Sequence, residues 1–110
     1  MNIGDLPFTL TNWEDILKGE HPGEKGTSSW RVFEGGNIRV RVIEYSPGYR
    51  SDHWCPRGHV LYVLEGEFGL ELKDGRNIVL RPGMSFQVGD DKENPHLGYS
   101  EKGAKVFIVD

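Results

Sequence analysis

Short strand-like segments, some alternating between apolar and polar residues and others continuously apolar, run through most of this chain. Six of them follow one another: residues 38–45, 60–64, 68–72, 77–80, 85–88 and 105–109. Alternation with a period of two is typical of β-strands that bury one face. Because the segments are short, roughly ten residues apart and separated by glycine-containing turns, they predict an antiparallel β-sandwich or β-barrel.

The turn between residues 68–72 and 77–80 contains the dipeptide Asp74-Gly75. Asp-Gly between two alternating segments is a strong hairpin signal, because a type I′ turn needs a positive φ at both of its central residues. The sequence therefore predicts a two-residue type I′ hairpin at this position.

The first 29 residues lack this alternation, and we expect them to form an arm laid over a barrel made of residues 30–110. Thr11 or Asn12 can cap a short helix over residues 13–18. The rest of the arm is rich in turn-forming residues and predicts a connector without regular structure. The chain is therefore expected to be a single domain.

Composition and charge argue against several classes of function. The 110 residues carry 13 basic and 17 acidic side chains, a formal charge of −4 without a dense basic stripe, so we expect no nucleic-acid partner. The longest apolar run, residues 60–64, is far shorter than the roughly 20 residues of a membrane helix, so we expect no membrane association. The single cysteine cannot form an intrachain disulfide, which predicts a soluble, cytoplasmic protein.

The segment 52–59, Asp-His-Trp-Cys-Pro-Arg-Gly-His, carries the side chains best suited to chemistry. In an extended backbone, residues two apart project to the same face, so His53 and Cys55 are expected to point together. A turn at residues 56–58 would then place His59 at the start of the next strand, facing the same interior. Two imidazoles and a thiolate suit a divalent transition metal, zinc first, with Fe(II), Ni or Cu as alternatives.

A fourth candidate ligand, His96, lies just before the last predicted strand, where closure of a barrel would bring its loop beside His53 and His59. The remaining histidine, His21, has no spaced partner and is expected to be exposed and metal-free. Each candidate also has a purely structural interpretation, because a free cysteine often packs as a small core residue and a histidine at a strand end is often simply hydrogen-bonded. The spacing alone leaves both interpretations open.

In their order along the chain, these residues resemble the first sequence motif of the cupin superfamily. That motif runs from a Pro-Gly turn through His-x-His and a glutamate into a hydrophobic strand that ends in glycine. The matching positions are Pro47, Gly48, His53, Cys55, His59 and residues 60–66. Residues 81–84 and His96 match the second motif only in part. The Asp-His-Trp-Cys run is similar to the small uncharacterised cupins named for their Asp, His, Cys and Trp motif.

The resemblance implies a double-stranded β-helix, or jelly-roll barrel, that holds a metal inside and forms a homodimer. The implied ligands are His53, Cys55, His59 and His96, with Cys55 in place of a histidine and His59 in place of a glutamate. Four such ligands suit a closed tetrahedral zinc site, which is typical of a structural metal. Apolar residues of the arm are expected to contribute to the dimer contact: Phe8, Trp13, Ile16 and Leu17.

The sequence therefore predicts a metal-binding cupin whose metal acts as a Lewis acid on a small polar metabolite of unknown identity. One alternative is a non-catalytic module that binds a small molecule or senses metal. Another is a metal-free isomerase or epimerase, with His53 or His59 as general base and Tyr99 or Tyr62 as acid. Whether the protein is an enzyme stays open, and no catalytic residue or further cofactor is assigned.

Two arginines near the predicted site have two possible orientations. Arg39 and Arg41 alternate with valines, so the simplest expectation places both on the exposed face of their strand. Alternatively, Arg41 shares a face with Ile43 and Tyr45, looks into the barrel and holds an anionic substrate. Tyr62 is expected outside the barrel, because its parity is opposite to that of its apolar neighbours.

Overall fold

The computed structural model describes residues 2–110, and nearly all of its regular structure is β-sheet. In chain order the strands are β1 (Gly19–Pro22), β2 (Thr27–Gly35), β3 (Ile38–Tyr45), β4 (Tyr49–Arg50), β5 (His59–Gly66), β6 (Phe68–Leu72), β7 (Asn77–Leu80), β8 (Ser85–Val88), β9 (His96–Ser100) and β10 (Ala104–Val109). The only helix within residues 2–110 is one 3-10 turn, η1 (Trp13–Asp15). No described helix is long and apolar enough to cross a membrane.

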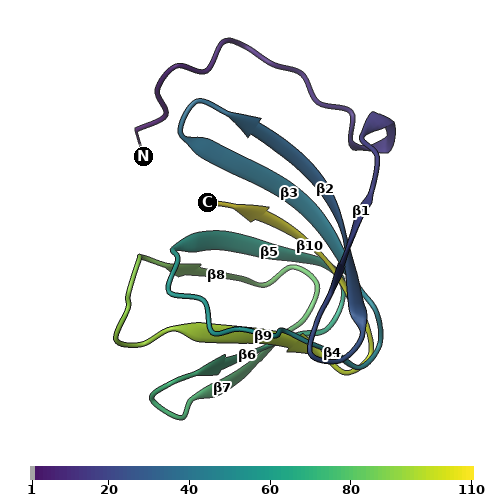
Figure 1. The fold of residues 1–110 in the computed structure, drawn as a ribbon, viewed down its shortest axis with the longest axis vertical. Coiled ribbons are helices and arrows are strands. Elements are labelled where there is room, and N and C mark those ends of the chain that lie inside the picture. The colour runs from purple at the N-terminus through teal and green to yellow at the C-terminus, as the bar shows by residue number, and fades with distance from the viewer. Residues whose placement is uncertain (1) are drawn as a thin grey trace.

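The strands form two antiparallel sheets that face each other and curve into a barrel (Figure 1). One sheet has six strands in the order β1-β2-β3-β10-β5-β8, and the other has four in the order β4-β9-β6-β7. Strands distant in sequence are therefore neighbours, because β10 lies between β3 and β5. This arrangement confirms the predicted all-β fold.

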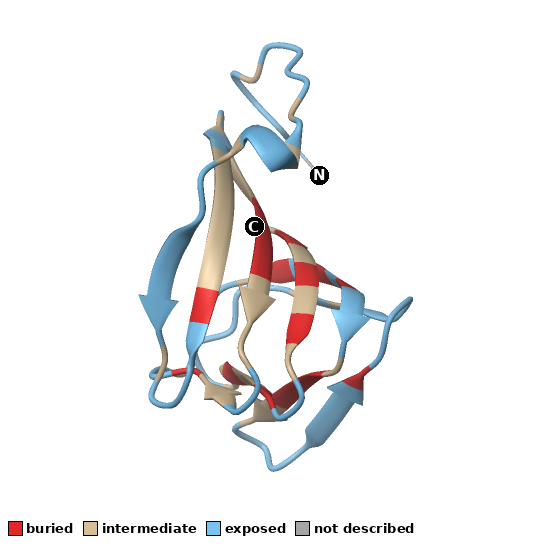
Figure 2. Ribbon diagram, turned by 90° about the vertical axis from the view of Figure 1, so that its right-hand side faces the viewer, coloured by how far each residue is buried: buried red, intermediate tan, exposed pale blue. Residues whose placement is uncertain are grey.

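The core lies between the two sheets, and β5 shows how the sequence builds it. Buried residues lie on strands of both sheets (Figure 2). Along β5, His59, Leu61 and Val63 are buried while the residues between them are exposed. Fully burying one such aliphatic side chain stabilises the fold by about 1.5–3 kcal/mol. His59 is in phase with the core residues, so the alternation that buries Leu61 also directs the imidazole inward.

All six predicted strands are present, but regular structure extends beyond them. β1 pairs with β2 from Gly19 opposite Trp30 to Pro22 opposite Thr27, so the expected connector is an antiparallel hairpin. β1 lacks alternation because all four of its residues are exposed, and it is held by backbone pairing at the sheet edge. The expected helix is limited to η1, which Asn12 caps by accepting a hydrogen bond from the backbone N–H of Glu14.

Strand β9 was not predicted, and His96 opens it instead of lying in a loop. Its central residue, Gly98, packs against the ring of Phe68, which would lie 2.7 Å from a Cβ at that position. A glycine inside a strand weakens the sequence signal, and here it makes room for a close approach of that ring.

The predicted hairpin between β6 and β7 is confirmed, but its turn is not type I′. Gly75 has a φ of +98°, whereas Asp74 is not among the described residues with positive φ. Asp74 instead accepts hydrogen bonds from the backbone and guanidinium of Arg76. This local side-chain bonding stabilises a longer loop that needs only one residue with positive φ.

Candidate functional site

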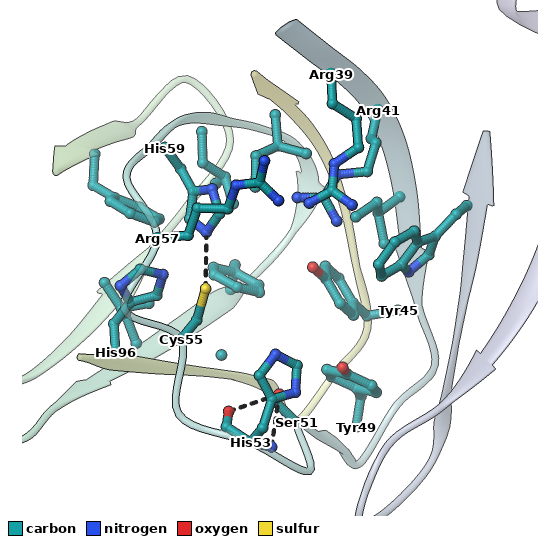
Figure 3. A pocket seen from close by; sticks show the side chains of 18 of the residues that line it. Arg39, Arg41, Tyr45, Tyr49, Ser51, His53, Cys55, Arg57, His59 and His96 are labelled. Atoms are coloured by element: carbon teal, nitrogen blue, oxygen red, sulfur yellow. Dashed lines mark hydrogen bonds between the residues drawn. The ribbon is translucent and has the colours of Figure 1, made fainter. Parts of the chain in front are cut away.

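A pocket of about 440 Å³ lies between the two sheets, a volume within the usual range for small-molecule sites. Residues of both sheets and of the segment between β4 and β5 line it. The polar lining residues include two groups, a Cys-His cluster and a set of arginines (Figure 3). The rest of the lining is largely aliphatic and aromatic.

Backbone pairing brings the first two members of the Cys-His cluster together. Cys55 and His96 form an isolated antiparallel bridge, in which the N–H of each residue donates to the carbonyl of the other, at 2.7 and 2.9 Å. Two residues that exchange both hydrogen bonds are direct cross-strand neighbours. The thiol and the imidazole are thus fixed side by side, although 40 residues separate them in the sequence.

The third member, His59, comes from the start of β5. Its Nε2 lies 3.5 Å from Sγ of Cys55, and its ring centroid lies 5.0 Å from that of His96 (Figure 3). One donor atom from each of Cys55, His59 and His96 lies within 4.8 Å of the others. Tetrahedral ligands at zinc distances of about 2.3 Å for sulfur and 2.0 Å for nitrogen would lie about 3.5 Å apart, so the Cys55-His59 pair fits such an ion.

Asp110 lies on the far side of the His59 ring. Its Oδ2 is 3.1 Å from Nδ1 of His59, but the direction is not that of a hydrogen bond, and Nδ1 has no other partner. A carboxylate at this distance favours the tautomer with the proton on Nδ1, which leaves the Nε2 lone pair directed toward Cys55. A small rotation of either side chain would complete a carboxylate-histidine arrangement of the kind that orients metal ligands.

Burial keeps both cluster histidines neutral. Burial, and next the nearby His96, lower the pKa of His59 to about 4, although Asp110 acts in the opposite direction. Burial also lowers the pKa of His96, with a smaller effect from His53. Neutral imidazoles are the form that binds a metal.

His53 lies at the rim of the pocket and outside this cluster. Its side chain is 69% exposed, and its Nδ1 lies 2.8 Å from Oδ1 of Asp52. The chain bends here, because the hydroxyl of Ser51 donates to the carbonyl of His53. The expected extended geometry from His53 to Cys55 is therefore interrupted. His21 is exposed, as expected, and its ring stacks on Trp30 at a centroid distance of 3.9 Å.

The simplest expectation for Arg39 and Arg41 was wrong, because both line the pocket and Arg41 is only 5% exposed. Arg39 donates to both carboxylate oxygens of Asp110, and Arg41 donates to one of them. Burial alone would raise the pKa of Asp110, but the hydrogen bond from Arg39 and the two guanidinium charges lower it below its usual value. The carboxylate therefore stays ionised.

The outer face of the six-stranded sheet is also covered. The valines of β3 can therefore be shielded from water on the side of the strand opposite the arginines. Val42 is buried, and its cross-strand neighbour on β10 is Phe107. Trp13 packs edge-on against Phe107 at a centroid distance of 6.2 Å. The arm thus gives the valine side of β3 an apolar environment, so apolar residues do not mark the barrel interior here.

Neither tyrosine expected to act as an acid lines the pocket. Tyr62 is 43% exposed on the outside of β5, as its parity predicted. Tyr99 packs over Gly69, and its hydroxyl donates to Asn77. The hydroxyls of Tyr45 and Tyr49 face the pocket instead (Figure 3). Sequence reasoning gave no role to Asp110, whose partner Arg39 is 71 residues away, so no local signal could have found it.

No known protein-family profile matches the chain, and no curated protein sequence is significantly similar to it. Solved structures do resemble it. A predicted oxalate decarboxylase from Thermotoga maritima superposes with a TM-score of 0.77 at 13% identity, over 92% of this chain and 96% of that one. An RmlC-like cupin from Shewanella frigidimarina gives a TM-score of 0.71 at 21% identity, over 96% and 91% of the two chains.

A third structure, Fe(II)-HppE with an alternative substrate, gives a TM-score of 0.75 at 15% identity. The match covers 94% of this chain and 60% of that one. At these identities the likeness concerns the fold alone. The narrower resemblance to the small cupins with the Asp-His-Cys-Trp motif stays a prediction.

Proposed function

Because the chain has the cupin fold, we propose that it binds a divalent transition metal inside the barrel through Cys55, His59 and His96. The observation that carries this proposal is the convergence of one thiol and two neutral imidazoles, with Sγ 3.5 Å from Nε2. The name of one structural neighbour, Fe(II)-HppE, supports metal chemistry on this fold. The proposed ion is zinc, because thiolate together with imidazole favours it over harder ions.

The number of ligands decides what such an ion would do. Three protein ligands leave a fourth tetrahedral position for water or substrate, which is typical of catalytic zinc sites. His53 is the proposed fourth ligand of a closed site, and its exposed side chain would have to leave Asp52 to reach the cluster. The open site supports an enzyme, whereas the closed one supports the non-catalytic binding or sensing module.

In the open form, a bound divalent ion supplies Lewis-acid polarisation of an oxygen atom on a small polar metabolite. The chain itself supplies the rest of the site. The carboxylate of Asp110 favours the tautomer of His59 that exposes Nε2, and the backbone bridge fixes Cys55 beside His96. The aromatic lining restricts water around the ligand and strengthens polar interactions within the pocket.

The metal-free isomerase lacks comparable support, because neither of its expected acids lines the pocket. The proposal also includes the cytoplasm as the compartment, since a single thiol that binds metal must stay reduced. It further includes a homodimer to which the arm contributes.

Metal analysis of protein purified without added metal tests this proposal directly. We expect close to one zinc ion per chain. The variants Cys55→Ala, His59→Ala and His96→Ala should each lose most of it, because a site with two remaining protein ligands holds zinc weakly. His21→Ala is the matched control and should keep its metal. Protein that folds normally but stays metal-free after incubation with zinc would contradict the proposal.

Cobalt substitution tests the thiolate and separates the open from the closed site. A cobalt ion bound through Cys55 should give intense thiolate charge-transfer absorption, which Cys55→Ala removes. If the site is open, His53→Ala should leave the spectrum unchanged and an added anion should shift it. A spectrum that changes in His53→Ala and does not respond to anions indicates a closed site.

A further inference from the structure

Three arginine side chains meet at one side of the pocket, around the carboxylate of Asp110. Arg39 donates from Nε and Nη2 to the two oxygens of Asp110, at 3.0 and 2.9 Å. Arg41 donates from Nη2 to Oδ2 at 3.0 Å, and Nε of Arg57 lies 3.9 Å from the same oxygen. Because three guanidinium groups surround one carboxylate, this side of the pocket carries an excess of positive charge.

Some donors of these arginines have no partner among residues 2–110. The side chain of Arg41 is 6% exposed, yet its Nε is buried without a hydrogen bond. A buried N–H left unpaired costs about 1–3 kcal/mol, so a ligand that accepts from it would gain that energy. Arg57 is 57% exposed, and its guanidinium extends into the pocket beside His59 (Figure 3). These two side chains can still bind an anion.

The wall away from the arginines is apolar and largely aromatic. It is formed by Ile43, Tyr45, Tyr49, Phe68, Leu70 and Phe86. Burial, and next the neighbouring Tyr49, raise the pKa of Tyr45 far above its ordinary value, so its hydroxyl keeps its proton and can donate. A ligand in this pocket therefore meets cationic donors at one end and ring faces along its body.

We propose that the pocket binds a small carboxylate with a flat, apolar body, its carboxylate on Arg41 and Arg57 and its body against the aromatic wall. The donors left free by Asp110 suit the two oxygens of a planar carboxylate better than the three of a phosphate group. This inference rests on the proposed function, since it names the substrate class of the same pocket. Oδ2 of Asp110 contacts both Arg41 and His59, so a carboxylate held there lies next to the Cys-His cluster.

Calorimetric titration with benzoate, and with the neutral isostere benzamide, tests the inference on the full chain. Benzoate should bind at least about tenfold more tightly than benzamide, because only benzoate makes charge-assisted hydrogen bonds to the arginines. Arg41→Gln should remove this preference. Arg57→Gln should weaken benzoate binding about threefold or more and leave benzamide unaffected. Arg76→Gln is the control and should change neither, because Arg76 pairs with Asp74 on the surface.

Arg57→Gln keeps the test decisive if Arg41→Gln does not fold, because Arg57 is mostly exposed and its nearest carboxylate oxygen is 3.9 Å away. Equal binding of benzoate and benzamide, or a preference for benzoate that survives in Arg57→Gln and in any folded Arg41→Gln, would overturn the inference. Tighter binding of phenyl phosphate than of benzoate would overturn the carboxylate class.

Zinc analysis of the same samples distinguishes the two proposals. Protein that holds no zinc, yet binds benzoate through its arginines, would refute the metal site and retain the carboxylate site. Protein that holds zinc but does not distinguish benzoate from benzamide would refute the carboxylate site and retain the metal site.

Discussion

At the scale of single residues, one carboxylate organises both polar groups of the pocket. The side chain of Asp110 is 1% exposed, accepts hydrogen bonds from Arg39 and Arg41, and contacts Nδ1 of His59. An ionised group this deeply buried is tolerated only when it is paired. The arginines, in turn, point inward because this carboxylate offsets the unfavourable burial of their charge. Asp110 therefore influences both which face of β3 points into the barrel and how the ring of His59, a candidate metal ligand, is oriented.

Replacing this carboxylate should destabilise the protein strongly. Asp110→Asn removes the charge that compensates two guanidinium groups, and we expect the free energy of unfolding to fall by about 3–5 kcal/mol, as when one partner of a buried ion pair is removed. Urea unfolding at pH 7 measures the change. Asp74→Asn, in a pair on the surface, is the control and should have little effect. Equal stability of the two variants would show that the buried network contributes nothing.

The lowered pKa of His59 predicts how the stability of the metal-free protein depends on pH. Its pKa is about 4 in the folded chain against an ordinary value of 6.5. As the pH falls from about 6.5 to about 4, the unfolded chain therefore takes up a proton that the folded chain does not, and stability decreases. The full loss is on the order of 3 kcal/mol.

Urea unfolding of chelator-treated protein at several pH values between 7 and 4 measures this loss. His59→Gln should lose less stability over the same range, because it lacks the titrating group. Parallel curves for the two proteins would assign the pH dependence to other residues.

At the scale of elements, glycines allow strands to meet where a side chain would not fit. Gly66 ends β5 with a φ of +77°, and a Cβ there would lie 2.1 Å from the carbonyl oxygen of Gly103. The pairing of β5 with β10 shifts register nearby, between Lys105 and Val106. Such an irregularity increases the local twist of a strand pair, which helps a sheet to curve into a barrel.

Gly66→Ala should therefore destabilise the barrel. The positive φ and the backbone contact both oppose a Cβ, so we expect a loss of at least about 2 kcal/mol in the free energy of unfolding. Gly89→Ala is the matched control, since a Cβ there meets nothing within 4 Å, and it should change stability by no more than about 0.5 kcal/mol. Thermal unfolding compares the two. Similar transition temperatures would mean that the β5-β10 junction relaxes to admit the methyl group.

At the scale of the whole molecule, the arm is held at both ends but exposes its apolar side chains. The N–H of Gly4 donates to Asn37, and Arg31 donates to the carbonyl of Ile16. Between and just beyond these contacts, three large apolar residues are almost fully exposed: Phe8 at 96%, Leu10 at 88% and Leu17 at 91%. The outer face of β5 is also apolar, because Val60, Tyr62 and Leu64 are exposed on it. Surfaces of this kind commonly mark a protein-protein contact.

We therefore expect two copies of the chain to associate through the arm. Sedimentation of the purified protein should give the mass of a dimer at micromolar concentration. Phe8→Ser combined with Leu10→Ser should weaken this dimer at least about tenfold, because both side chains would lose buried apolar area. Thr9→Ser, in the same exposed segment, is the control. A wild-type protein that sediments as a monomer would refute the expectation.

The sequence by itself determined the strand pattern, because alternation and glycine turns are local properties. It also determined the inward direction of His59, since that residue is in phase with Leu61 and Val63 on β5. Barrel closure let the sequence anticipate that His96 lies near the other candidate ligands, but its backbone bridge with Cys55 depends on the assembled strands. β1 and β9 were not predicted, because their local sequence patterns are weak and they are defined by pairing with β2 and β6.

Only the tertiary structure decided which face of β3 is the interior. The alternation of arginine with valine is the same whichever face is buried, and the outcome depends on two distant elements. Asp110 supplies the inner charge, and the arm covers the outer valines. The bend that turns His53 toward Asp52 also depends on the surrounding fold. Long-range partners fix such orientations because burial and charge pairing depend on the assembled chain, and these partners are not encoded in any local pattern.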